Sequence, residues 1–140
     1  IDEKDRLARL VSEVPGPFGP LMDRYWPGPL TLIFPARPDL PPLLTAGTGT
    51  IGVRISSNRT AAEICRRAGG MITATSANLS GEQPAWSAEE LLRSFSNSIE
   101  LIVDGGHLDQ VPPSTVVRCE NDELVTVRPG RIGLGDITTS

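Results

Sequence analysis

Four short runs of apolar, β-favouring residues constrain the fold of this chain more than any other feature. They cover residues 30–34, 50–55, 71–75 and 115–119, and each is bounded by glycine or proline turns. Helical patterns lie between them, and strands that alternate with helices along a chain are typical of α/β proteins. We therefore predict an α/β fold in which these four runs share one sheet.

The intervening segments carry apolar residues at helical spacing or the residues that cap helices. They predict a helix over residues 2–13, a short helix from Phe18 to Tyr25, a helix that begins at Ser57 or Asn58 and ends at Gly69 or Gly70, and a helix from Ser87 to about Phe95. Thr60 with Glu63, and Ser87 with Glu90, have the spacing of a capping box. A further strand is expected over residues 99–103, and residues 112–128 are typical of a β-hairpin with its turn at Asn121 and Asp122.

The run at residues 71–75 leads into a polar loop in which Ser76, Asn78 and Ser80 alternate. Loops at the ends of strands in an open α/β sheet are where such proteins usually hold ligands. Hydroxyl and amide side chains can donate hydrogen bonds to phosphate or carbonyl oxygens there. The same residues also commonly satisfy their own backbone in a turn, so the pattern alone leaves both interpretations open.

The composition restricts the function to certain classes. The chain has 140 residues, enough for one domain, and its formal net charge of −4 does not favour non-specific binding of nucleic acid. Lys4 is the only lysine, and arginine is suited to planar recognition of carboxylate and phosphate. Cys65, Cys119 and His107 have no metal-site or Cys–His spacing, so we expect no metal site. No apolar run approaches a membrane span, so we expect a cytoplasmic protein with no membrane partner.

Two large side chains each allow two interpretations. Strand alternation over residues 51–55 puts Gly52 and Arg54 on one face, where Arg54 either faces solvent at an edge or lines a cleft. Trp26 begins a Trp-Pro-Gly-Pro turn, where it either stacks on a purine or anchors the turn to the core. We favour the anchor, because large aromatic side chains most often serve the core.

Four sequence blocks, taken together and in order, resemble a known family. They are Trp26-Pro27-Gly28-Pro29-Leu30-Thr31-Leu32, Thr50-Ile51-Gly52-Val53-Arg54-Ile55, Ile72-Thr73-Ala74-Thr75-Ser76-Ala77-Asn78-Leu79-Ser80-Gly81, and Pro113-Ser114-Thr115-Val116-Val117 with Arg128-Pro129-Gly130. They closely resemble the YrdC-like family, the threonylcarbamoyl-AMP synthases that serve tRNA modification. The resemblance extends from about residue 20 to residue 132.

The resemblance implies a twisted, open, mixed β-sheet with flanking helices. It also implies a cytoplasmic nucleotidyltransferase that joins L-threonine, bicarbonate and ATP into threonylcarbamoyl-adenylate and releases pyrophosphate. ATP and Mg²⁺ would enter together as a substrate complex, with no tightly bound cofactor. A tRNA-modifying threonylcarbamoyl transferase complex would then take the product, with tRNA itself as a possible further partner.

The resemblance also assigns roles to six residues. Ser76 and Asn78 match the family's Ser-x-Asn nucleotide-binding element, and Thr50 and Arg128 match contacts to the nucleotide and its triphosphate. Arg54 matches the arginine that binds the threonine carboxylate, and Ser114 matches a residue close to the threonine or carbamate. Arg54 and Ser114 are therefore the expected catalytic residues, and we expect all of these side chains except Thr50 to converge on one cleft.

The chain departs from the family pattern at its start. Family members carry a Thr-x-Tyr-Gly-Leu stretch and a Lys-x-Arg element upstream of this region, and Lys4-Asp5-Arg6 imitates only the second, within a helical pattern. We therefore expect residues 1–132 to be the C-terminal two-thirds of a YrdC-like domain, followed by a flexible tail over residues 133–140. A chain without half of its anion site is expected to be inactive on its own.

Two other functions remain open at this stage. The first is an RNA-binding module, because the concave family surface has been considered a face for double-stranded RNA. The second is a YrdC-like carbamoyl-transfer domain of a larger protein, such as a hydrogenase-maturation factor. Salt-dependent RNA binding would favour the first, and acylphosphatase-like or zinc-finger sequence upstream would favour the second.

Overall fold

A computed structural model describes residues 1–79, 81–95, 98–133, 135 and 137 of the chain. It divides the chain into two compact units, one formed by residues 1–72 with 112–140 and the other by residues 73–111. All four strands of the sheet belong to the first unit. The prediction of one domain over residues 1–132 stays a prediction.

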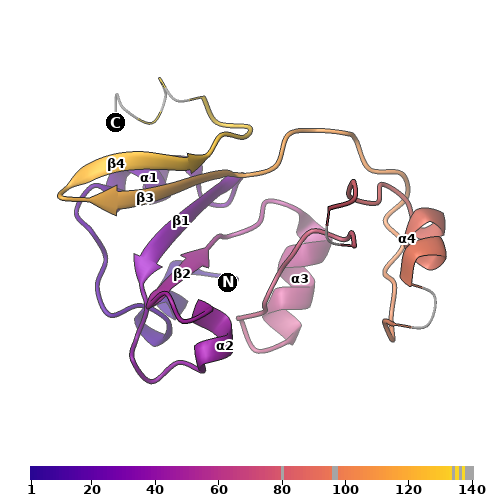
Figure 1. Ribbon diagram of the computed structural model, residues 1–140, viewed down its shortest axis with the longest axis horizontal. Helices are drawn as coiled ribbons and strands as arrows, with labels where there is room; N and C mark the ends of the chain where they lie inside the picture. Colours follow the sequence, from indigo (N-terminus) through magenta and orange to yellow (C-terminus); the bar gives the residue numbers. More distant parts are fainter. Residues whose placement is uncertain (80, 96–97, 134, 136, 138–140) are drawn as a thin grey trace. The chain divides into compact units, whose positions relative to one another are not determined.

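The first unit is built on a four-stranded mixed sheet (Figure 1). Its strands are β1 (Leu30–Pro35), β2 (Thr50–Val53), β3 (Thr115–Glu120) and β4 (Glu123–Arg128). Their order across the sheet is β2-β1-β3-β4, with β1 antiparallel to β2 and parallel to β3, and β3 antiparallel to β4. The predicted open mixed sheet with flanking helices is confirmed.

One face of this sheet is covered by the segment that precedes it. Leu30, Leu32 and Phe34 alternate along β1 and are fully buried, since successive strand residues point to opposite faces. They share the core with Leu7 of the 3₁₀ helix η1 (Lys4–Arg9) and with Phe18, Leu21 and Met22 of α1 (Phe18–Tyr25). The Phe18 and Phe34 rings pack edge to face, 5.0 Å apart.

Trp26 anchors the turn between α1 and β1. Its side chain is buried, and its indole Nε1 donates a 2.8 Å hydrogen bond to the Leu30 carbonyl oxygen. In the same turn, the Gly28 amide donates to the Ile55 carbonyl oxygen, and a Cβ at Gly28 would lie 2.3 Å from the Tyr25 carbonyl oxygen. The anchoring interpretation of Trp26 is confirmed, and the turn admits only glycine at position 28.

The remaining helices begin at capping residues. In the first unit, α2 spans Pro42–Thr45, and α3 spans Arg59–Arg67, where the Asn58 side chain accepts a 2.9 Å bond from the Ala61 amide. In the second unit, the Ser87 hydroxyl accepts a bond from the Glu90 amide at the start of α4 (Ala88–Phe95). The caps at Asn58 and Ser87 are confirmed.

The expected capping box of Thr60 and Glu63 does not form, because Asn58 is the cap and the Glu63 carboxylate has other partners. It accepts hydrogen bonds from Arg66 and Arg67 instead, and these two guanidinium groups lower the pKa of Glu63 to about 2. The Glu63 carboxylate therefore binds two arginines in the last turn of α3 and does not cap the first turn of this helix.

Four predictions about regular structure were wrong. Residues 71–75 and 99–103 form no strand, and no described strand pairs with either segment, so their backbone lacks the neighbour that a strand needs. The strand expected over residues 50–55 ends at Val53. The helix expected over residues 2–13 is the six-residue η1, because the Val11 backbone then pairs with Ala36 in an isolated bridge.

The segment after β4 packs against the sheet. Ile132 and Ile137 are buried in the core, so residue 137 does not lie in a free tail. Residues 134, 136 and 138–140 of the expected tail lie outside the described residues. The buried Thr115 hydroxyl connects β3 to this segment, since it lies 2.9 Å from both the amide nitrogen and the carbonyl oxygen of Ile132.

Gly130 fixes the distance between this segment and the start of β3. A Cβ at Gly130 would lie 2.3 Å from the Pro113 carbonyl oxygen and 2.6 Å from backbone atoms of Ser114 and Thr115. Backbone atoms cannot give way as the end of a flexible side chain can. The backbone at the end of the Arg128-Pro129-Gly130 block therefore contacts the backbone of the Pro113-Ser114-Thr115 block directly.

Gly130→Ala is expected to lower the free energy of unfolding by about 1–3 kcal/mol, the usual range for an added methyl group in a filled site. Gly16→Ala is the matched control, because a Cβ there meets nothing within 4 Å and its change should stay within about 0.5 kcal/mol. Urea unfolding followed by circular dichroism measures both. Equal stability of the two variants would contradict the close backbone contact.

Candidate functional site

The face of the sheet opposite the core carries polar and charged side chains. Alternation along β1 places Thr31 and Ile33 on this face, and the register pairs Ile33 with Gly52 and Thr31 with Val116. The same register pairs Val116 with Arg128 on β4. We call this surface the open face, because its side chains are half-buried or exposed whereas those of the other face are buried.

Ser114 and Arg128 are in direct contact at the end of this face. The Arg128 guanidinium Nη2 donates to the Ser114 carbonyl oxygen at 2.8 Å and to its hydroxyl oxygen at 3.1 Å. The Ser114 hydroxyl oxygen also lies 2.9 Å from the Thr31 hydroxyl oxygen, and Ser114 is only 9% exposed. Three residues from three different segments thus form one hydrogen-bonded group.

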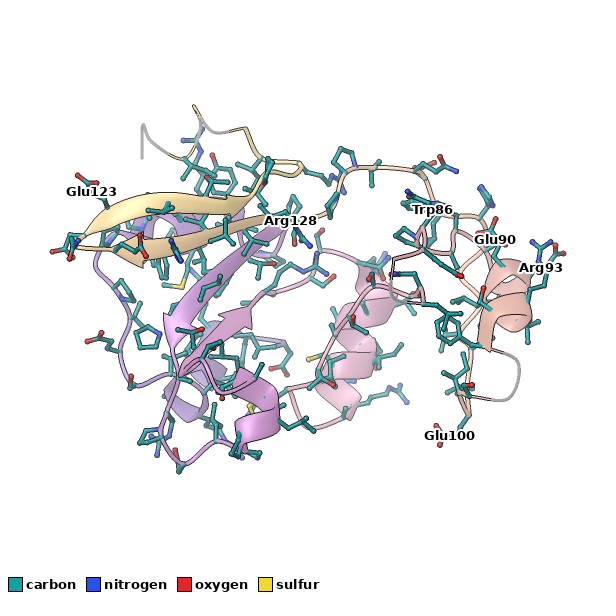
Figure 2. All side chains as sticks on the ribbon, in the orientation of Figure 1. Trp86, Glu90, Arg93, Glu100, Glu123 and Arg128 are labelled. Atoms are coloured by element: carbon teal, nitrogen blue, oxygen red, sulfur yellow. The ribbon has the colours of Figure 1, made fainter. Side chains whose placement is uncertain are left out.

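A register shift directs Arg128 toward Ser114. The β3–β4 pairing passes from Val117 opposite Thr126 to Val116 opposite Arg128, so one extra residue, Val127, lies on the β4 side. Bulges of this kind re-aim the side chains that follow them. Figure 2 shows Glu123 and Arg128 at the two ends of β4.

Arg54 follows β2, and alternation from Gly52 places it on the open face. Although the residue is exposed, neighbouring protein atoms displace water around its guanidinium, and this desolvation lowers its pKa. The positive charge of Arg128 lowers that pKa further. Arg54 stays protonated at neutral pH all the same, because arginine pKa values lie far above 7.

Arg54 and Arg128 thus form a pair of like charges on one face. Among the described residues, no carboxylate bridges either guanidinium, whereas Arg6, Arg37, Arg66, Arg67 and Arg118 all form salt bridges. Arg128 also uses only its Nη2 atom in the hydrogen bonds to Ser114. Two unneutralised cations beside a hydroxyl group favour an anionic ligand such as a carboxylate or a phosphate.

The structure brings together Arg54, Ser114 and Arg128, but Thr50 lies elsewhere. Thr50 pairs with Pro35 at one end of β1, whereas Thr115 pairs with Leu30 at the other end. Five residue steps of strand separate these ends by roughly 17 Å. The Thr50 hydroxyl bonds to the Thr48 hydroxyl at 2.9 Å. Its role as a nucleotide contact stays a prediction.

Ser76 and Asn78 belong to the second unit, and their convergence with Arg54 and Arg128 also stays a prediction. Ser76 is exposed, and Ser80, the third polar residue of that loop, lies outside the described residues. The Asn78 amide Nδ2 donates to the Leu79 carbonyl oxygen at 2.8 Å, whereas its buried Oδ1 atom has no hydrogen-bond partner among the described residues. An unpaired buried acceptor calls for an explanation, and a ligand that donates a hydrogen bond would supply one.

Lys4 and Arg6 are already neutralised by carboxylates. Lys4 Nζ lies 2.5 Å from Asp23, and Arg6 lies 3.2 Å from Asp2. A Cβ at Gly70, which adopts φ +88°, would lie 2.5 Å from Arg6 Nε, so the Arg6 side chain packs on this glycine backbone. These contacts support a structural role for both cations.

The described residues contain no cluster of three metal-ligating His, Cys, Asp or Glu side chains. Cys65 is buried, as expected for a core residue, and Cys119 is half-buried with a pKa raised by burial; both are free thiols. In the part of the chain that the structure describes, no helix has the length and apolar character needed to cross a membrane.

Thr31 is the member of this group that sequence reasoning missed. Its sequence block is typical of a turn followed by a strand, and no adjacent residue in the sequence marks Thr31 as part of a polar site. The signal that could have found it is the register of the parallel β1–β3 pair, which brings Thr31 next to Ser114.

Comparison with known proteins gives one consistent family. A family model described as "Telomere recombination", Sua5_yciO_yrdC, matches residues 1–130. The Threonylcarbamoyl-AMP synthase of Bacillus subtilis (strain 168) is 40% identical over 133 residues, which cover 94% of this chain and 38% of that protein. The chain therefore spans about two fifths of the length of this relative.

Two solved structures share the fold. The crystal structure of Pyrococcus abyssi Sua5 complexed with L-threonine has a TM-score of 0.90 at 34% identity, covering 98% of this chain and 40% of that one. The crystal structure of Escherichia coli YciO has a TM-score of 0.83 at 28% identity, covering 96% of this chain and 66% of that one. With a family model that spans most of its length and a matching fold, this chain belongs to the Sua5/YciO/YrdC family, which includes relatives named Threonylcarbamoyl-AMP synthase.

Proposed function

We propose that this chain takes part in the synthesis of threonylcarbamoyl-AMP from L-threonine, bicarbonate and ATP, and that its open face binds the anionic groups of these substrates. The observation that carries the proposal is the pair of arginines, Arg54 and Arg128, with no carboxylate partner and with Ser114 bonded to one of them. The names of the relatives supply the reaction class, and the relative solved with L-threonine supports a threonine site.

The chemistry of this reaction fits what these residues can do. The amino group of threonine and bicarbonate form a carbamate with release of water. A carbamate oxygen then attacks the α-phosphate of ATP, so that a new P–O bond forms while the P–O bond to the leaving pyrophosphate breaks. The reaction therefore needs positioning and neutralisation of several negative charges more than it needs a protein nucleophile. Guanidinium groups serve this purpose because they bind carboxylate and phosphate through two parallel hydrogen bonds.

Each residue has a proposed role. Arg54 binds the threonine carboxylate, and the Ser114 hydroxyl group donates a hydrogen bond to the carboxylate or carbamate beside it. Arg128, held by the Ser114 carbonyl, presents its remaining N–H groups to the triphosphate. Ser76 and Asn78 contact the nucleotide. Because Asn78 Nδ2 is used by the Leu79 carbonyl, its free Oδ1 atom accepts a bond from an N–H or O–H group of the nucleotide and does not bind a phosphate oxygen.

Mg²⁺ enters this proposal only as part of the MgATP substrate complex. The open face offers arginines and hydroxyl groups, and Mg²⁺ prefers carboxylates, phosphates and water as ligands. The triphosphate is therefore the expected ligand of the ion. The product passes to a tRNA-modifying threonylcarbamoyl transferase complex, and a cytoplasmic location belongs to the same proposal.

An RNA-binding role and a role as a carbamoyl-transfer domain of a larger maturation protein stay predictions. With a net charge of −4 and five arginines already in salt bridges, the described residues favour a small anion over a long phosphate backbone. RNA binding that weakens steeply with salt would favour the RNA-binding role instead.

Arg54→Gln and Arg128→Gln, introduced separately into the gene product that contains this chain, are each expected to lower the rate of pyrophosphate release by about 10²–10³. The measurement is pyrophosphate release with threonine, bicarbonate and MgATP, with the adenylate identified by mass spectrometry. Arg9→Gln is the matched control, since Arg9 is exposed in η1, which packs on the covered face, and should change the rate little. A wild-type rate in both site variants would contradict the proposal.

Asn78→Leu separates a ligand contact from a structural contact. Leucine has a similar shape and removes a buried acceptor that has no partner among the described residues, so the free energy of unfolding should change by no more than about 1 kcal/mol. Affinity for MgATP, measured by isothermal titration calorimetry, should fall about tenfold. Unchanged affinity together with lost stability would show that Asn78 is structural.

A further inference from the structure

We infer that Thr31 is a positioning residue for the anion site: its hydroxyl group holds the Ser114 hydroxyl, and through it the Arg128 guanidinium, in the orientation that meets the substrate anion. The inference rests on the proposed function of the open face and adds a residue to it. The observation that carries it is the 2.9 Å contact between the Thr31 and Ser114 hydroxyl oxygens, next to the 3.1 Å bond from Arg128 to the same Ser114 oxygen.

The protons of this group can be counted. Arg128 can only donate, so the Ser114 oxygen accepts its bond. The two hydroxyl groups of Thr31 and Ser114 have two protons but share one hydrogen bond. One hydroxyl proton therefore remains for a third partner, and no described protein atom is recorded as taking it from Ser114 or Thr31.

The hydrogen bond between Thr31 and Ser114 can run in either direction, and a bound anion selects one of the two directions. When Thr31 donates to Ser114, both acceptor sites of the serine oxygen are filled, by Thr31 and by Arg128, and the serine proton is free to point at the ligand. A negative ligand oxygen beside Arg128 favours this arrangement. Hydrogen bonds that share an atom also polarise one another, so the serine becomes a better donor.

Thr31 is well placed to hold this orientation. It lies on β1, a central strand that pairs with β2 on one side and with β3 on the other. Its β-branched side chain has few rotamers, and its methyl group faces Gly52, where a Cβ would lie 3.4 Å away. Ser114, in contrast, lies outside regular secondary structure, directly before β3, so the orientation of its side chain depends on its partners.

The test compares Thr31→Val, which removes the hydroxyl group and keeps the shape, with Thr31→Ser, which keeps the hydroxyl group. Thr126→Val is the matched control: the same substitution in the same sheet, at a threonine whose side chain has no recorded hydrogen bond to a described residue. The probe is L-threonine, with MgATP as the second probe, and Kd is measured by isothermal titration calorimetry on the gene product that contains this chain. Pyrophosphate release gives KM and kcat for the same variants.

Thr31→Val is expected to raise the Kd for L-threonine or MgATP about tenfold and to lower kcat. Its unfolding midpoint is expected to equal that of Thr126→Val. Thr31→Ser is expected to restore affinity to within about threefold of the wild type. Wild-type affinity and kcat in Thr31→Val would overturn the inference. A loss in Thr31→Ser as large as in Thr31→Val would also overturn it, because the hydroxyl group would not then be the cause.

These outcomes separate the inference from the proposed function. If Arg54→Gln and Arg128→Gln lower the rate while Thr31→Val does not, only the role of Thr31 is wrong. If neither arginine variant affects binding or rate, the anion site itself is wrong, and the role of Thr31 falls with it.

Discussion

The parallel pairing of β1 with β3 is the constraint on which the rest of the structure depends. It joins residues 85 positions apart in the sequence, such as Leu30 and Thr115, and brings the Thr31 hydroxyl to the Ser114 hydroxyl. The close approach of Gly130 to the Ser114 backbone and the Thr115 bonds to Ile132 hold the loop before β3 in place. The site is therefore a direct product of the way in which this sheet is assembled.

The division of the sheet into two faces explains both stability and function. Apolar residues of η1 and α1 cover one face, which frees the other face from any role in the core. On that open face, Arg54 directly follows β2 and Arg128 ends β4, the two strands at opposite edges of the sheet. Burial together with mutual repulsion lowers the pKa of Arg54. Like charges without a carboxylate partner cost stability, and a bound anion offsets that cost.

The sequence predicted most of the first unit and the chemistry of its site. Glycine and proline turns marked β1 and the hairpin, and family blocks marked Arg54, Ser114 and Arg128. The apolar run at residues 71–75 misled the prediction, because β propensity does not tell whether a neighbouring strand exists. Thr31 and the bulge that directs Arg128 were missed for a related reason, since both are consequences of pairing between distant segments.

The most direct test of the account is the NMR spectrum of the arginine side chains during titration with L-threonine. The guanidinium Nε–H signals of Arg54 and Arg128 report on the two cations that the account places at the site. They are expected to shift in a saturable way, while those of Arg37 and Arg66, which are already paired with carboxylates, stay in place. Unshifted signals from Arg54 and Arg128 at saturating threonine, or equal shifts of all four arginines, would contradict an anion site on the open face.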